Sequence, residues 1–367
     1  MQARLMGTMG DVYAGLGLYD QAKHLVQETI DTHRRVSGST APETLRSQRL
    51  LGWLQMRRGE YNAAEKLLRS TLDQQTRLLG PNSSETLKTA STLGGLYSQE
   101  GRYADAGKIL TNVLDVQRRM HGRDDPATLD VMSNLATIYD GLHLYPKEEA
   151  MFRELSEVRQ RVLGLDHPST LAAMGNLAYV AFREGKLSEA EKLQREVLDT
   201  SRRVLGPERP NVLMTAGNLA NTLQSERRFP EAEKLQREVL DARRKVLGPD
   251  NPDTLFSINN LAELLALEGQ LDEAERLFLQ ALAGERRVLG ESHPEVGYVL
   301  YNLASVQAAK KHPSQALDYL HQAVQHGYNN PDEMGSDESL KPLRSLPEYQ
   351  ALLAEVQRRS AAVKNSH

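Results

Sequence analysis

Apolar residues follow the period of an α-helix along most of the chain, in stretches that come in pairs. Between positions 125 and 164, the first stretch places apolar residues on one helical face at Leu129, Met132, Leu135, Ala136 and Tyr139. The second stretch does so at Met151, Phe152, Leu155 and Val158. Asp125 is suited to cap the first helix, and Pro126 is suited to its first turn. This segment therefore predicts two helices of about 15 residues each, joined by a turn near Gly141.

The pair recurs with a step of 42 residues. Glycine marks the step at Gly38, Gly80, Gly122, Gly164, Gly206, Gly248 and Gly290. Proline marks it at Pro42, Pro126, Pro168, Pro210, Pro252 and Pro294, with Ser84 in the vacant place. A second series, suited to helix ends, is formed by Gly17, Gly59, Gly101, Gly185 and Gly269. Neither helix of a pair can bury its apolar face alone, so the pairs must stack into an all-α solenoid. We expect eight helix pairs over residues 1–326, the first incomplete at its start, and a divergent helical cap and tail over 327–367.

Composition narrows the classes of function. With 45 Lys and Arg against 49 Asp and Glu, the net charge of −4 gives no general electrostatic reason to bind nucleic acid. Cysteine is absent, which excludes disulfides and thiolate metal sites. No stretch approaches the ~20 apolar residues of a membrane span, so a cytoplasmic location is expected. No set of nucleophile, base and orienting residue can be identified. We therefore expect a monomer that is not an enzyme, with no cofactor and no metal.

The recurring residues resemble tetratricopeptide repeats. The resemblance is carried by Asn-Leu-Ala triplets, by Ala-Glu pairs such as Ala190–Glu191, and by Leu-Gly followed by proline. The triplets stand at 134–136, 176–178, 218–220, 260–262 and 302–304. The step matches the 42-residue subtype of kinesin light chains and many bacterial proteins. This resemblance implies a right-handed superhelix of antiparallel helix pairs. It also implies a scaffold whose first helices line a concave groove that binds a protein or peptide segment.

A second stripe runs beside the apolar face of each first helix and repeats one asparagine. The five are Asn134, Asn176, Asn218, Asn260 and Asn302. An amide both donates and accepts hydrogen bonds, which matches the backbone of an extended peptide. The same amides could instead tie adjacent repeats together, and both interpretations stay open. By resemblance the stripe is the floor of the groove, which also carries Asn221, Asn259, Tyr179, Tyr298 and Tyr301.

Toward the N-terminus the stripe becomes basic and contains the only tryptophan. It carries Arg46, Arg49, Trp53, Arg57 and Lys88. A tryptophan beside arginines favours an anchor pocket for an acidic or aromatic peptide. The alternative is that Trp53 packs against the neighbouring helix pair. The partner is thus expected to be a protein or peptide, with an acidic segment as one candidate.

Two further interpretations compete with the scaffold. Residues 3–19 resemble the start of repeat arrays that follow bacterial serine/threonine kinase domains, and residues 327–354 resemble the segment closing such arrays. The alternative function is a regulatory or sensor repeat domain of a kinase or other signalling protein, although no kinase motif is present in this chain. The other concerns arginine pairs ending the second helices, which could form a ladder for nucleic acid. They are Arg34–Arg35, Arg118–Arg119, Arg202–Arg203, Arg243–Arg244 and Arg286–Arg287. Because cations stabilise helix C-termini, we interpret these pairs as structural.

Overall fold

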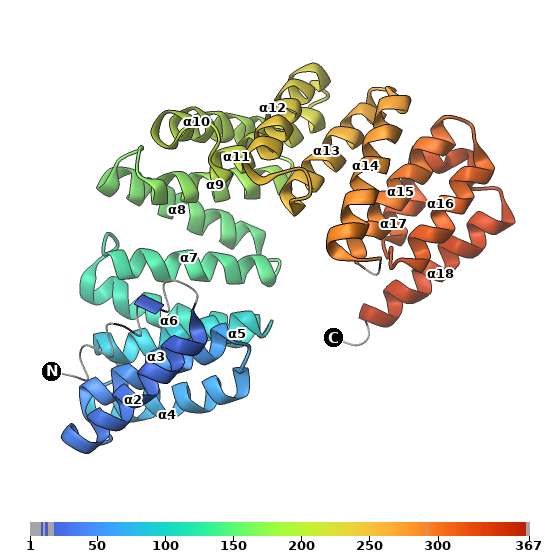
Figure 1. The fold of residues 1–367 in the computed structure, drawn as a ribbon. Helices are drawn as coiled ribbons and strands as arrows, with labels where there is room; N and C mark the ends of the chain where they lie inside the picture. The colour runs from blue at the N-terminus through green and yellow to red at the C-terminus, as the bar shows by residue number, and fades with distance from the viewer. Residues whose placement is uncertain (1–8, 10–11, 14–17, 292, 365–367) are drawn as a thin grey trace. The chain divides into compact units, whose positions relative to one another are not determined.

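The described part of the chain is all-helical. The computed structural model describes residues 9, 12–13, 18–291 and 293–364, in which there are seventeen α-helices, one 3-10 helix and no strand (Figure 1). By its contacts the chain divides into two compact units, Met1–Val180 and Ala181–His367. Of the expected first helix of the first pair, only Met9, Val12 and Tyr13 are described, and Gly17 at its end lies outside the described residues. Within the described ranges, no helix combines the length and the apolar character needed to cross a membrane.

Helices alternate in length along both units. In unit 1 the second helices are α2 (Tyr19–Ser37), α4 (Tyr61–Leu79), α6 (Tyr103–His121) and α8 (Tyr145–Leu163). The first helices there are α3 (Pro42–Arg57), α5 (Ser84–Gln99) and α7 (Pro126–Gly141), and α9 (Pro168–Arg183) contains the division between the units. First helices have 16 residues, and second helices have 19 except the last one, which has 13. Most second helices are therefore longer than the expected 15 or so.

Unit 2 continues the alternation and ends in a different segment. Its repeats comprise α10 (Leu187–Leu205), α11 (Pro210–Ser225), α12 (Phe229–Leu247), α13 (Pro252–Leu267), α14 (Leu271–Leu289), α15 (Pro294–Ala309) and α16 (Pro313–Gln325). The C-terminal segment consists of α17 (Pro331–Ser336), the 3-10 helix η1 (Glu338–Leu343) and α18 (Pro347–Lys364). Leu340, Leu343 and Leu352 are buried in one apolar core with α15 and α16, and Leu346 and Leu353 pack against that core. The segment therefore covers the end of the last repeat.

Local signals in the sequence explain where the helices begin and end. The Asp125 carboxylate accepts hydrogen bonds from the amides of Ala127 and Thr128, and Asn251 accepts one from Asp253, as expected of N-caps. The glycines at first-helix ends have positive φ, for example +75° at Gly185. Three other residues occupy this left-handed position in their own copies: His143, Arg227 and Lys311. Glycine is thus favoured here but not required.

Small residues let the two helices of a pair approach closely. Alanines near the start of second helices are fully buried at Ala64, Ala106, Ala190, Ala232 and Ala274. On the facing first helices, a Cβ atom at Gly52 would lie 2.6 Å from Leu68 Cγ, and one at Gly94 would lie 2.9 Å from Leu110. Interhelical distance depends on side-chain size at the contact. This contact sets the spacing of the pairs.

From α2 to α8 in unit 1 and from α10 to α16 in unit 2, each helix packs on the next along the chain. First helices also touch across repeats, as α3 and α5 do in unit 1 and α13 and α15 in unit 2. Second helices are linked across repeats by ion pairs. Arg118 donates to Glu154 at 2.7 Å, and Arg202 donates to Glu238 at 3.3 Å. Because these groups are partly exposed, each pair contributes little to stability. The arginines at the helix ends are nevertheless engaged within the protein, as their structural interpretation requires.

Candidate functional site

The repeated asparagines differ in their hydrogen bonding. Asn134 and Asn176 in unit 1 are exposed, whereas Asn218, Asn260 and Asn302 in unit 2 are half-buried. Among the described residues, the side-chain amides of the first four have no hydrogen-bond partner. The Asn302 amide, by contrast, donates to Glu263 Oε1 at 2.9 Å, from α15 to α13. A tie between adjacent repeats is therefore present at Asn302 and absent at the other four.

In unit 2 an apolar row accompanies the asparagines. Met214, Phe256 and Tyr298 each stand four residues before an asparagine of the series, and they are 54%, 53% and 40% exposed. Residues four apart lie on the same face of a helix, one turn from each other. Each first helix of unit 2 thus presents an exposed apolar side chain beside an amide. In unit 1 the aromatic residue expected on the stripe, Tyr179 on α9, is 47% exposed.

Other residues expected on the groove floor are already engaged. Asn221 Oδ1 accepts a 3.0 Å hydrogen bond from Nε2 of Gln236, a fully buried residue of α12. Asn259 donates to Glu263 Oε1 at 2.7 Å. Tyr301 is 2% exposed, and its hydroxyl donates to Asp337 Oδ2 at 2.9 Å. Tyr301 belongs mainly to the packing of the C-terminal segment on α15.

The basic stripe of unit 1 is partly neutralised. Glu85 lies 3.7 Å from Arg46 and 3.4 Å from Lys88, measured between charged atoms. Arg57 donates to the hydroxyl of Tyr19 at 3.1 Å, while the half-buried Arg49 has no partner for Nε among the described residues.

The Trp53 ring packs edge-on against Tyr19, with centroids 6.2 Å apart. Trp53 also lies against the apolar core of α2 and α3. Trp53 is thus packed against its neighbours within the chain. The group without a partner in this stripe is Nε of Arg49 and not the Trp53 ring.

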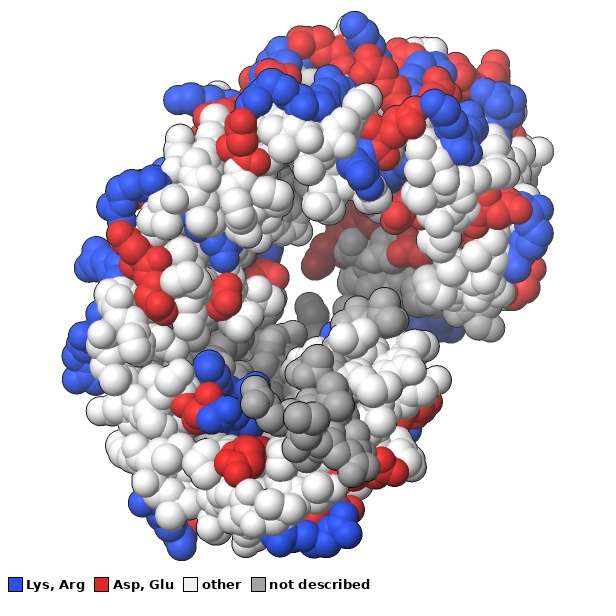
Figure 2. Space-filling model, turned by 60° about the vertical axis from the view of Figure 1, so that its left-hand side comes forward, with Lys and Arg blue, Asp and Glu red and all other residues white. Residues whose placement is uncertain are grey.

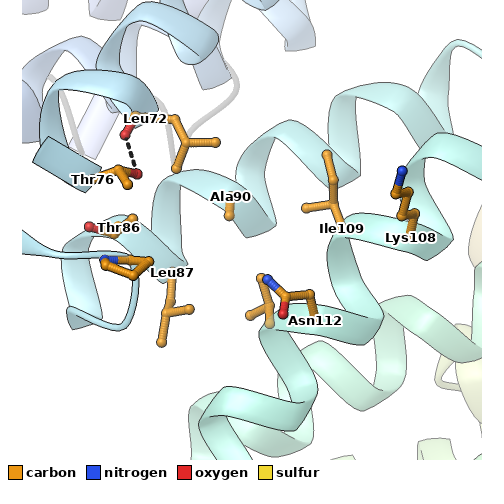
Figure 3. A pocket seen from close by; sticks show the side chains of 10 residues that line it. Leu72, Thr76, Thr86, Leu87, Ala90, Lys108, Ile109 and Asn112 are labelled. Carbon is orange, nitrogen blue, oxygen red and sulfur yellow. Dashed lines mark hydrogen bonds between the residues drawn. The ribbon is translucent and has the colours of Figure 1, made fainter.

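A crevice on unit 1 is a product of repeat packing. It has a volume of about 370 Å³ and lies between α4 and α6, with α5 behind it (Figure 3). Its lining includes Thr76, Leu87 and Val113. A second crevice, on unit 2, is lined at the corresponding positions by Arg202, Leu213 and Val239, each 126 residues or three repeats later. Because the crevice recurs in the same register, with leucine and valine kept at two of these three positions, it follows from the way the repeats pack.

Charge is distributed without a large field of one sign on the face shown in Figure 2, where basic and acidic side chains are interspersed. Within the described residues, no group of three or more His, Asp or Glu converges as a metal site. One hollow in unit 2 is different, because its charged lining residues are all acidic. They are Glu263, Glu333 and Asp337. Glu263 lies on the first helix α13, four residues after Asn259, but the other two come from the C-terminal segment, where the 42-residue register gives no guide to their position.

Comparisons with known proteins agree with the fold. Matches to the tetratricopeptide repeat family cover residues 1–77, 54–106, 85–161, 149–203, 169–245, 211–284 and 253–326. No curated protein matches the chain. A crystal structure of nearly identical repeats of a kinesin light chain from Podosopora anserina is 26% identical, with a TM-score of 0.50, covering 55% of this chain and 95% of that one.

Two other solved structures share the fold at lower identity. BtubC from P. vanneervenii is 22% identical, with a TM-score of 0.52, covering 62% of this chain and 90% of that one. A Rap protein complexed with competence and sporulation factor is 11% identical, with a TM-score of 0.58, covering 99% of this chain and 98% of that one. The stacked helix pairs, their 42-residue step and the family matches over 1–326 lead to one conclusion. The chain belongs to the tetratricopeptide repeat family.

Proposed function

We propose that this protein is a non-enzymatic scaffold that binds an extended peptide segment along its first helices. The observation that carries the proposal is the unpartnered state of the amides of Asn134, Asn176, Asn218 and Asn260. Asparagine disfavours a helix interior by roughly half a kcal/mol relative to alanine. An amide that stabilises nothing within the chain is suited to bind a ligand instead.

The neighbouring apolar row supplies the second element of a peptide site. A peptide backbone can exchange hydrogen bonds with the amides, while its side chains contact Met214, Phe256 and Tyr298, which are exposed in unit 2. The same fold accommodates a bound factor in the Rap protein. The alternative of a kinase regulatory domain gains no support from the family matches, which cover the repeats alone.

The test uses a peptide selected by display on the folded full chain. Replacing Asn176, Asn218 and Asn260 together by alanine removes three amides, each worth about 1 kcal/mol or fivefold in affinity. We expect binding to weaken by about a hundredfold. The melting temperature should not fall, because these amides have no partner in the fold, and it should rise slightly because alanine favours a helix interior over asparagine.

Asn302→Ala is the matched control, because this amide already donates to Glu263. It should lower the melting temperature and affect binding less than any of the other three single substitutions. Normal binding by the triple variant would refute the proposal.

A further inference from the structure

The acidic hollow of unit 2 has the form of a side-chain pocket. Its volume is about 350 Å³, and it is lined by residues of α11, α13, α14, α15, α17 and η1. Such a volume lies in the range of small-ligand sites, about 300–1,000 Å³. Phe278, Leu271 and Val306 contribute apolar surface, and polar groups lie on the α13 and C-terminal sides. The pocket therefore combines an apolar part with a charged part.

The three carboxylates of this pocket have no cationic partner among the described residues. Asp337 accepts hydrogen bonds from Tyr301, from Ser305 and from the Ser339 amide. Glu333 accepts from Tyr328 and Asn330. No lysine, arginine or histidine lines the pocket. All of these donors are neutral, so the negative charge of the pocket is left uncompensated.

Several carboxylates on the second helices of the repeats, by contrast, form ion pairs with arginines. On the second helices, Glu191 lies 2.6 Å from Arg228, and Glu273 lies 3.2 Å from Arg237. These acidic groups serve packing between repeats and are paired for it. The absence of a cation is thus a property of the pocket and not a general feature of the chain.

Of the three carboxylates, Glu263 has an oxygen atom that is available to a ligand. Both amides that reach it, from Asn259 and Asn302, donate to Oε1, and Oε2 receives no hydrogen bond from the described residues. Burial raises the pKa of this carboxyl above its usual range, against the effect of the two amides. In the other copies, the position that corresponds to Glu263 in the 42-residue register is occupied by Asp11, Trp53, Gly95, Thr137, Tyr179, Asn221 and Ser305. Within unit 2 an acidic residue occurs at this position only at Glu263, and Asp11 at the other end of the array is the one other acidic member, which suits a specificity position.

We propose that this pocket binds the basic side chain, arginine or lysine, of a peptide lying on the first helices of unit 2. The aliphatic stem of such a side chain packs on the apolar part, and its cation faces Glu263, Glu333 and Asp337. The inference rests on the proposed function, since a peptide must carry the side chain. A basic side chain on the peptide differs from the acidic segment that the basic stripe of unit 1 favours as a partner.

The test titrates the full-length protein with three synthetic peptides, Ac-Ala-Leu-Ala-X-Ala-Leu-Ala-NH2, in which X is arginine, citrulline or glutamate. Citrulline keeps the shape of arginine without its charge. Methyl NMR signals of Val306 and Leu267, both in the pocket lining, report occupancy. We expect the arginine peptide to bind about tenfold more tightly than the citrulline peptide, and the glutamate peptide to bind most weakly.

Glu263→Gln should remove this preference, and Glu333→Gln should reduce it without touching the amides of α13 and α15. The control is Glu268→Gln, because Glu268 stands just after α13, accepts from Gln270 and does not line the pocket. This variant should keep the tenfold preference. Equal binding of the arginine and citrulline peptides, or loss of the preference in Glu268→Gln as well, would overturn the inference.

The two proposals fail in different ways. If the peptides bind alike and the triple asparagine variant weakens them all, the scaffold stands and the basic-side-chain pocket falls. If the arginine preference persists while the asparagine variant binds normally, the pocket stands and the asparagine-lined scaffold falls. If none of the peptides shifts the pocket methyl signals, the pocket inference falls, and the display-selected peptide decides the scaffold separately.

Discussion

The ring of Tyr301 lies flat on the ring of Tyr328, with centroids 4.3 Å apart and planes inclined by 6°. Tyr301 is on α15, the first helix of the last pair, and Tyr328 lies between α16 and the C-terminal segment. Both side chains are buried, and Tyr298 contacts the Tyr328 ring edge-on. Burial raises the pKa of both Tyr301 and Tyr328, so both phenols stay neutral and continue to donate hydrogen bonds. This stack joins the repeats to the segment that ends them.

Substitution of Tyr328 tests this junction. Tyr328→Ala removes a fully buried ring and should destabilise the protein by about 3–5 kcal/mol. Tyr328→Phe keeps the stack but loses the hydroxyl contacts with Asn330 and Glu333, and should cost about 1–2 kcal/mol. Urea denaturation measures both, and hydrogen exchange should locate the loss in the C-terminal segment. Equal effects of the two variants would show that the hydroxyl, and not the stack, holds the junction.

Removal of the C-terminal segment should expose the end of the last repeat. Truncation after Gly327 deletes the buried side chains of Leu340, Leu343 and Leu352, which share a core with α15 and α16. End repeats need a polar outer face for solubility. We expect a lower melting temperature and aggregation on gel filtration. A monomeric truncated protein with an unchanged melting temperature would show that the segment contributes nothing to the core.

The buried carboxyl of Glu285 should lower the free energy of unfolding as the pH rises. This residue of α14 is 4% exposed, and Oε2 has no hydrogen-bond partner among the described residues. Burial and the Glu295 carboxylate raise the pKa of Glu285 to about 7. One repeat earlier, Arg243 occupies this place and donates to Ser257 at 2.7 Å. Below pH 4.5 or so the carboxyl is protonated in both the folded and unfolded states. Between there and about pH 7 the unfolded state loses its proton first, so stability declines, and above pH 7 it stays lowered.

Glu285→Gln should remove this decline. The variant should exceed the parent protein by about 2 kcal/mol at pH 8, after allowance for solvent screening, and should match it more closely at pH 5. Denaturation at the two pH values checks the difference. Glu157→Gln, at an exposed position of α8, is the control and should leave the profile of the parent. A uniform gain of Glu285→Gln at both pH values would point to packing rather than ionisation.

The left-handed residues at first-helix ends give a matched pair of substitutions in unit 2. Arg227 has φ of +60°, and Gly185 takes the same position one repeat earlier with φ of +75°. Arg227→Gly should stabilise by up to about 1 kcal/mol, and Gly185→Ala should destabilise by about 1 kcal/mol, because only glycine adopts this region without strain. A Cβ at Gly185 meets no atom within 4 Å, so the second effect isolates the backbone. Thermal melts of both variants test the signs.

The repeat made most of the fold predictable from sequence. Helix ends follow from local residues, such as the Asp125 cap and the glycines at first-helix ends, and these act through neighbouring backbone atoms. The apolar face of each helix follows from its period, because a helix that cannot bury that face alone must stack on its neighbours. Each of these signals recurs several times at the 42-residue step. The stacked helix pairs and the family could therefore be inferred from the sequence alone.

Tertiary structure decided which polar residues are free. Five asparagines look equivalent in the sequence, yet only Asn302 meets a carboxylate on the preceding first helix. Glu263 stands 39 residues before Asn302. The helical period predicts which residues share a face of one helix, but it does not predict a hydrogen bond between two helices. Asp337 and Glu333 reach the same pocket from a segment outside the repeat register. Side-chain partners depend on contacts between helices distant in sequence, and so the composition of the acidic pocket could be seen only in the folded chain.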